Sequence, residues 1–158
     1  MKKGQAWGFD LIVAFFLFTG GIVLFYYYSL NYSTEGKQAI EGLSYDGNLI
    51  ADGLLSEGFP DNWNKTNVTK IGLLNEKKIN QTKLERFYNL SVDDYSRTKS
   101  LFNTKYNYFL TMSEPIIIDG GEIEGIGQRN LNPKNLVRVT RFTIYQNKPV
   151  TLHIEMWE

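Results

Sequence analysis

A run of about twenty uncharged residues near the N-terminus, from Leu11 to Leu30, constrains this 158-residue chain more than any other feature. At about 1.5 Å of rise per residue, a helix of this length measures about 30 Å, the thickness of the hydrocarbon core of a bilayer. The run therefore predicts a membrane-spanning helix. Lys2 and Lys3 precede it, and the next basic residue is Lys37. Positive charge favours the cytoplasmic side, so we expect a cytoplasmic N-terminus and an extracytoplasmic remainder.

A secretory signal peptide is the competing interpretation of the same segment. Its apolar region usually has about 7 to 15 residues and is followed by a small-x-small cleavage site. The run in this chain is longer, no such site follows it, and an acid, Asp10, stands at its start. These features favour a helix that is retained in the mature protein.

Asp10 needs its own explanation, because a carboxylate at the edge of the hydrocarbon is costly unless it stays at the interface or has a partner. One interpretation is an interfacial acid that the positive N-terminal end of the helix dipole stabilises. The other rests on the residues upstream, which are Lys2-Lys3-Gly4-Gln5. This order of lysines, Gly-Gln, acid and apolar helix resembles the leader of archaeal type IV pilin-like proteins. The resemblance implies that a peptidase facing the cytoplasm cuts between Gly4 and Gln5 and leaves the helix intact.

The chain departs from the pattern of that family at two positions. A glutamate usually occupies the fifth mature position, where this chain has Phe9, and the acid, Asp10, is sixth. Trp7 replaces the small polar residue that is common at the third mature position. A shift of one residue rotates the carboxylate by about 100° around a helix. The role of Asp10 as a partner of a neighbouring subunit's amino group therefore stays open.

Residues 33–58 are polar but keep a helical periodicity, which predicts an amphipathic stalk helix that Gly58 and Pro60 stop. Its apolar residues recur mostly at steps of three and four: Ala39, Ile40, Leu43, Ile50, Ala51, Leu54 and Leu55. Internal glycines weaken a helix by up to about 1 kcal/mol each relative to alanine. A break of the helix is therefore expected near Gly36 or Gly47.

Residues 59–158 predict a small extracytoplasmic domain, which makes the fold α+β. We expect strands at 68–74 and 106–112, helices at 81–88 and 92–102, and turns at Pro115 and 119–121. Strands at 136–145 and 150–157 are joined by 146–149, which predicts a hairpin. Alternation in the last strand places Val150, Leu152, Ile154 and Met156 on one face and Thr151, His153, Glu155 and Trp157 on the other. The apolar face of this antiparallel sheet is expected to lie on the stalk helix.

Several segments of the outer domain also look like small membrane-anchored pilin-like proteins of archaea. They are residues 54–63, Ile71-Gly72-Leu73, Lys83-Leu84 and the strand part 141–145. With the leader, the resemblance covers most of the chain. It implies a leader at 1–4, a transmembrane helix at 5–32, a stalk helix at 33–58 and a domain at 59–158. It assigns no binding residues to this chain.

Asn-x-Ser/Thr sequons are more frequent than chance predicts, which is typical of an exported, glycosylated surface. They begin at Asn31, Asn64, Asn67, Asn80 and Asn89. Asn31 is the weakest candidate because we expect it to lie too close to the membrane. An Asn-rich and Thr-rich composition produces the same excess without any sugar.

The residues needed for most catalytic and metal chemistry are scarce. The chain has no cysteine and a single histidine, His153, for which the sequence offers no catalytic partners. Asp119, Glu122 and Glu124 surround a pair of glycines, but their spacing does not match a calcium loop, and a solvated turn is the better interpretation. Seventeen basic residues balance seventeen acidic ones, so the basic excess of nucleic-acid-binding proteins is absent. We expect no enzyme activity, cofactor, metal, nucleic acid or small-molecule substrate.

The leading functional hypothesis is a non-enzymatic, type IV pilin-like or minor pilin-like subunit of the cell surface. Its helix would hold it in the membrane as a single span and would pack with related subunits in a filament. The expected partners are membrane lipid, a prepilin peptidase and other pilin-like subunits. The alternative is a permanently anchored surface protein, with an adhesion or accessory role, that does not polymerise.

Overall fold

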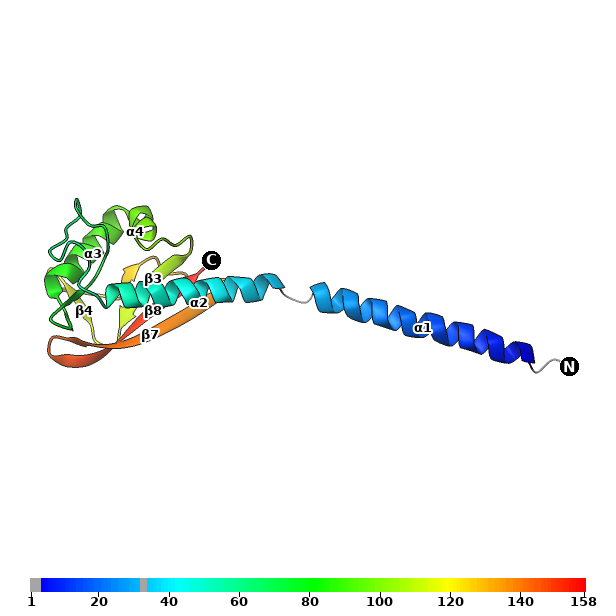
Figure 1. Ribbon diagram of the computed structural model, residues 1–158. Coiled ribbons are helices and arrows are strands. Elements are labelled where there is room, and N and C mark those ends of the chain that lie inside the picture. Colours follow the sequence, from blue (N-terminus) through cyan, green and yellow to red (C-terminus); the bar gives the residue numbers. More distant parts are fainter. Residues whose placement is uncertain (1–3, 32–33) are drawn as a thin grey trace. The chain divides into compact units, whose positions relative to one another are not determined.

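The computed structural model describes the backbone of residues 4–31 and 34–158 and the side chains of residues 8–30 and 36–158. The chain forms two compact units, of which the first ends at Gln38 and the second is Ala39–Glu158. Helix α1 covers Gly4–Asn31 and belongs to the first unit (Figure 1). Its segment Gly8–Leu30 is, among the described residues, the one helix that is long and apolar enough to cross a membrane. The coarse prediction of an N-terminal apolar helix and an α+β fold is confirmed.

Helix α2 covers Thr34–Leu54 and runs without a break through Gly36 and Gly47, so the helix is not interrupted at either glycine. Residues 32–33, between α1 and α2, lie outside the described residues. Gly47 is buried where α2 meets the sheet, and a Cβ there would lie 2.9 Å from Cγ2 of Val139. The glycine is thus needed for close packing. The helix ends at Leu54 rather than at Gly58, because Ser56 turns back and its hydroxyl donates to the Gly53 carbonyl at 2.6 Å.

The second unit contains one main antiparallel sheet with the order β6-β3-β8-β7. Its strands are β3 (Asn107–Met112), β6 (Ile126–Gly127), β7 (Leu136–Tyr145) and β8 (Lys148–Trp157). Two small hairpins accompany it: β1 (Leu74–Asn75) with β2 (Lys78–Ile79), and β4 (Ile116–Ile118) with β5 (Gly121–Ile123). Asp119 and Gly120 form the tight turn of the second hairpin, as expected, and both have positive φ.

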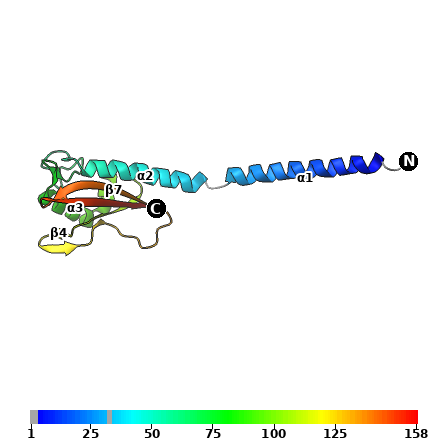
Figure 2. The same cartoon turned by 90° about the horizontal axis from the view of Figure 1, so that it is seen from below.

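Helices α2, α3 (Gln81–Asp93) and α4 (Tyr95–Leu101) share one face of this sheet. Tyr108 on β3 and Met156 on β8 are direct partners and therefore point to the same side. Met156 lies under α2 at Gly47, and the Tyr108 ring packs 6.2 Å from that of Phe87 on α3. Figure 2 shows α2 running along the strands of the sheet. The expectation that the apolar face of the sheet lies on the stalk helix is confirmed.

A single residue separates α3 from α4 and explains why the predicted helix bounds were wrong. Asp94 closes α3 with its N–H on the Leu90 carbonyl, and its carboxylate accepts the N–H of Arg97 to cap α4. The first helix therefore continues to Asp93, and the second begins at Tyr95 instead of residue 92.

The strand expected at 68–74 is almost entirely absent, since only Leu74 of that range lies in a strand. The N–H groups of Leu73 and Leu74 donate to the carbonyls of Leu54 and Ser56, at 2.8 and 2.9 Å. Lys70 makes an isolated antiparallel bridge with Phe59, and only Leu74 pairs with a strand residue, Ile79. The segment thus bonds mainly to the end of α2 and to the residues that follow it. Gly72 lies in this contact, where a Cβ would overlap the backbone of Gly58.

The β7–β8 hairpin is confirmed, but its connection is shorter than expected. Tyr145 pairs with Lys148, so that Gln146 and Asn147 alone form the turn, with φ of 49° and 61°. Two positive φ values are those of the tight turn that matches the twist of a hairpin. Strand β8 therefore begins at Lys148 and not at Val150.

The alternation expected for β8 is confirmed for its apolar face and fails at one position of the other. Val150, Leu152, Ile154 and Met156 are buried. Trp157 shares the opposite side with His153 and Glu155, yet it is only 4% exposed. The amide of Asn135 donates to the carboxylate of Glu158 at 2.8 Å and holds the segment before β7 against this end of the strand.

Candidate functional site

The side chains of α1 are apolar on all sides and exposed from Gly8 to Leu30. Phe18 is 71% exposed and Phe25 is 74% exposed. A helix that is apolar around its whole circumference requires an apolar environment, which is either lipid or the helices of other chains. Tyr26, Tyr27 and Tyr28 stand at its end, where such rings suit a membrane–water interface.

The residues of the predicted leader are only partly described. Lys2 and Lys3 lie outside the described residues, and the Gly4–Gln5 bond lies in the first turn of α1. Asp10 is exposed and stands six residues after the first residue of the helix, since α1 begins at Gly4. The helix dipole acts mainly within the first turn, so it does not explain an acid at this position. A partner outside the chain or the membrane interface is the remaining explanation.

Within the second unit, α2 also presents apolar side chains to solvent. Leu43, Ile50 and Leu54 face the core and are at most 2% exposed. The other side of the helix carries Tyr45 and Leu49, which are 66% and 53% exposed. We call these two residues the α2 strip, which was not predicted from the sequence. Ile40 lies on the same side of the helix as Leu43, as its spacing predicts, but it is 48% exposed.

The sequon asparagines of the second unit lie in turns, at the start of α3 and on the exposed side of that helix. Asn64 accepts the hydroxyl of Thr66 at 2.6 Å, and Asn67 accepts the N–H of Asn64 at 2.7 Å. Asn80 is the N-cap of α3, and Asn89 is exposed on that helix. These hydrogen bonds use the oxygen of the side-chain amide. The amide nitrogen, which is the atom to which a sugar is attached, is not used by them. The side chain of Asn31 lies outside the described residues.

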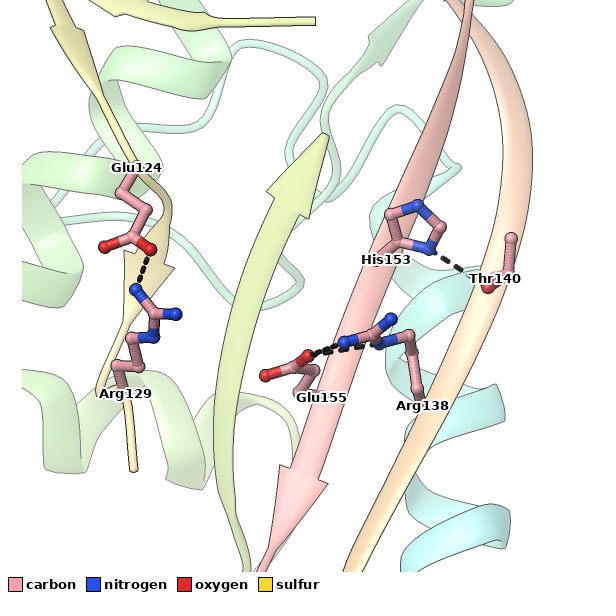
Figure 3. A network of polar contacts seen from close by, with 6 residues as sticks. All are labelled: Glu124, Arg129, Arg138, Thr140, His153 and Glu155. Carbon is pink, nitrogen blue, oxygen red and sulfur yellow. Dashed lines mark hydrogen bonds and ion pairs between the residues drawn. The ribbon is translucent and has the colours of Figure 1, made fainter. Parts of the chain in front are cut away.

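The acidic turn and the histidine form no reactive cluster. Glu124 makes an ion pair with Arg129, and the ring of His153 bonds the hydroxyl of Thr140 at 3.1 Å between Nδ1 and Oγ1 (Figure 3). Glu155, the acid nearest to His153 on its strand, is bonded to Arg138. The described residues contain no group of three or more His, Cys, Asp or Glu side chains that could hold a metal.

A polar cleft at the start of α3, which we call the α3 cleft, was not predicted from the sequence. It has a volume of about 470 Å³, and Glu57, Asp61, Asn62, Asn80, Lys83 and Arg86 are among its lining residues. The lining residues come from two segments, 57–62 and 80–86, and from Asn75 between them. The only local signal was the spacing of Lys83 and Arg86, which places two cations on the same face of a helix.

The most strongly perturbed titratable groups lie in the core. The Tyr108 hydroxyl is 2.6 Å from that of Thr98, and the Tyr95 hydroxyl accepts the Tyr108 N–H at 2.8 Å. Burial raises the pKa of both phenols above the ordinary value of 10.0. A buried network with all its polar atoms bonded stabilises the fold and offers nothing to a substrate.

We expect this network to make the second unit sensitive to alkali. Because the folded state raises the pKa of Tyr108, the stabilisation is complete below pH of about 10, the unfolded value, and is lost as the pH rises above it. The free energy of unfolding should fall by about 1.4 kcal/mol per pH unit from this residue alone. Urea unfolding of the full chain between pH 9 and 11 measures the slope. Tyr108→Phe should make it shallower, and an unchanged slope would contradict the assignment.

Comparison of the chain with protein-family models, with curated proteins and with solved structures found no match.

Proposed function

We propose that this chain is a non-enzymatic, type IV pilin-like or minor pilin-like subunit of an archaeal cell surface. Helix α1 would hold it in the membrane as a single span, with the N-terminus in the cytoplasm and the second unit outside. The subunit would then assemble into a filament through the same helix. The observation that carries the proposal is α1 itself, which is apolar on all sides and exposed from Gly8 to Leu30.

Physical chemistry explains how one helix can serve as both anchor and assembly element. Lipid tails are as apolar as Leu and Phe, so a transfer of α1 from lipid into a bundle of helices changes little hydrophobic free energy. Close packing at Gly20 and Gly21, where a Cβ would meet no atom of the chain within 4 Å, would then favour the bundle. Neutralisation of Asp10 by a neighbouring subunit would add to it.

The second candidate function is a permanently anchored surface protein with an adhesion or accessory role. The position of Asp10 favours it, because the acid stands one residue later than in the pilin-like pattern. The α2 strip fits both functions, since exposed apolar side chains of this kind can contact another subunit or another surface protein.

The intact mass and N-terminal peptides of the protein extracted from its native membranes test these proposals. A mature N-terminus at Gln5 is the result expected for a pilin-like subunit, since the prepilin peptidase would remove residues 1–4. A start at Met1 with α1 retained would favour the permanent anchor. A chain that has lost everything up to about Leu30 would contradict both.

A further inference from the structure

Lys83 is a buried cation in the α3 cleft whose partners are neutral. Its side chain is 7% exposed, and Nζ donates to the main-chain carbonyls of Glu57 and Leu74, both at 2.8 Å. No carboxylate lies within ion-pair distance of it in the described part of the chain. An ammonium group has three donors, and buried charges are normally paired. One N–H of Lys83 thus remains for an acceptor in the cleft.

Arg86 adds a second cation one turn further along α3. The guanidinium of Arg86 makes two hydrogen bonds, both from Nη1. They go to the side-chain oxygen of Asn62 at 2.7 Å and to the Trp63 carbonyl at 2.6 Å. Nε and Nη2 bond to no atom of the described residues. A guanidinium presents its remaining donors in a fixed plane that matches a carboxylate or phosphate.

The amides of the cleft also present donors. The oxygen of Asn62 is taken by Arg86, and that of Asn80 accepts the N–H of Lys83 at 3.1 Å. The NH₂ groups of both side chains are left free for other contacts. The N-terminal end of α3 adds a partial positive charge at the same place. The inner part of the cleft is therefore suited to a group that is negative and accepts several hydrogen bonds.

The rim has the opposite character. Glu57 and Asp61 line the cleft and are exposed, and ionised carboxylates only accept hydrogen bonds. A ligand that satisfies both regions needs an anionic group at one end and hydroxyl donors at the other. The volume of about 470 Å³ lies within the range of small-molecule sites, and every lining residue is polar.

We propose that the α3 cleft binds a sugar acid. The carboxylate of the sugar lies between Lys83 and Arg86, and its hydroxyl groups donate to Glu57 and Asp61. This inference goes beyond the proposed function and does not depend on whether the leader is cleaved or the subunit polymerises.

Titration of the full chain with glucuronate, in detergent and produced without glycosylation, tests the proposal. Binding should be followed by calorimetry or by NMR, with glucose as the neutral sugar and inorganic phosphate as the simple oxyanion. We expect glucuronate to bind at least about tenfold more tightly than either. Each control ligand lacks one of the two recognised groups. Glucose lacks the negative charge, and phosphate lacks the hydroxyl-bearing ring.

Two variants locate the ligand, since Lys83 also connects two segments and its replacement can impair folding. Arg86→Gln removes one cation, and Thr82→Trp fills the cleft from an exposed position in the first turn of α3. Both should weaken glucuronate binding at least about tenfold. Lys65→Gln is the matched control, because it removes an exposed cation outside the cleft, and it should leave the affinity unchanged.

Four results would overturn the proposal. The first three are a folded chain that does not bind glucuronate, equal affinity for glucuronate and glucose, and phosphate binding as tight as that of the sugar acid. Equal weakening by Lys65→Gln and Arg86→Gln would also do so, because it would show attraction by net charge without a defined site.

Discussion

Replacing Phe18 and Ile22 together by arginine is expected to remove most of the chain from the membrane fraction. Two arginines near the centre of a spanning helix cost about 5 to 7 kcal/mol of insertion free energy. About a dozen Leu, Ile, Val and Phe residues between Leu11 and Leu30 contribute about 4 to 7 kcal/mol in total. The cost of the two arginines therefore offsets nearly all of the favourable insertion free energy of α1. Alkaline carbonate extraction of membranes, followed by detection of the chain, gives the fraction retained.

The second unit offers a matched control for this experiment. Phe142 and Ile144 on β7 are 82% and 38% exposed, against 71% and 50% for Phe18 and Ile22. Phe142→Arg with Ile144→Arg adds the same charge to a surface that we place in water, and the retained fraction should not change. If the two double variants are retained in the membrane fraction to the same extent, α1 does not lie in a membrane, and the proposal of a membrane anchor is contradicted.

The second large effect is expected at Trp63, which is fully buried and whose indole donates to the Gly72 carbonyl at 2.9 Å. Trp63→Ala should lower the free energy of unfolding by about 3 to 5 kcal/mol, because it leaves a large cavity and an unbonded carbonyl. That is a large share of the stability of an ordinary domain. Urea unfolding of the full chain in mild detergent measures the change.

Val92→Ala is the control for Trp63, since this side chain is 66% exposed on α3. An exposed substitution of this kind should change the free energy of unfolding by less than about 0.5 kcal/mol. A Trp63 variant that lost no more than the Val92 variant would show that the 54–74 region is not part of the cooperative unit.

The elements that the sequence predicted well are those whose pattern is local and long. The uncharged run at 11–30 is sufficient by itself to predict α1, and the alternation of β8 together with its neighbouring turn predicts the last hairpin. In both cases each residue's environment follows from its place in a repeat. The exact turn was missed because Lys148 and Pro149 look like loop residues, although they pair with Tyr145 and Ile144.

The segment at 68–74 and the α3 cleft could not be predicted in the same way. Leu73 bonds to Leu54, and Lys83 bonds to Glu57, and these contacts join residues far apart in the chain. A short apolar run such as 68–74 suits a strand or an irregular core segment equally well. Which of the two forms depends on the partner of its backbone groups, and that partner is the end of α2.

The position of β8 in the middle of the sheet has a consequence for the order of events during biosynthesis. Strands β3 and β7 both pair with β8 and not with each other. The sheet therefore cannot assemble on the ribosome before residues 148–157 have been made, although α1 and α2 emerge first. Until then Leu43, Ile50 and Leu54 lack the strands that cover them, and exposed apolar surface of this kind favours aggregation. A chain translocated while it is still being made would complete this domain only on the far side of the membrane.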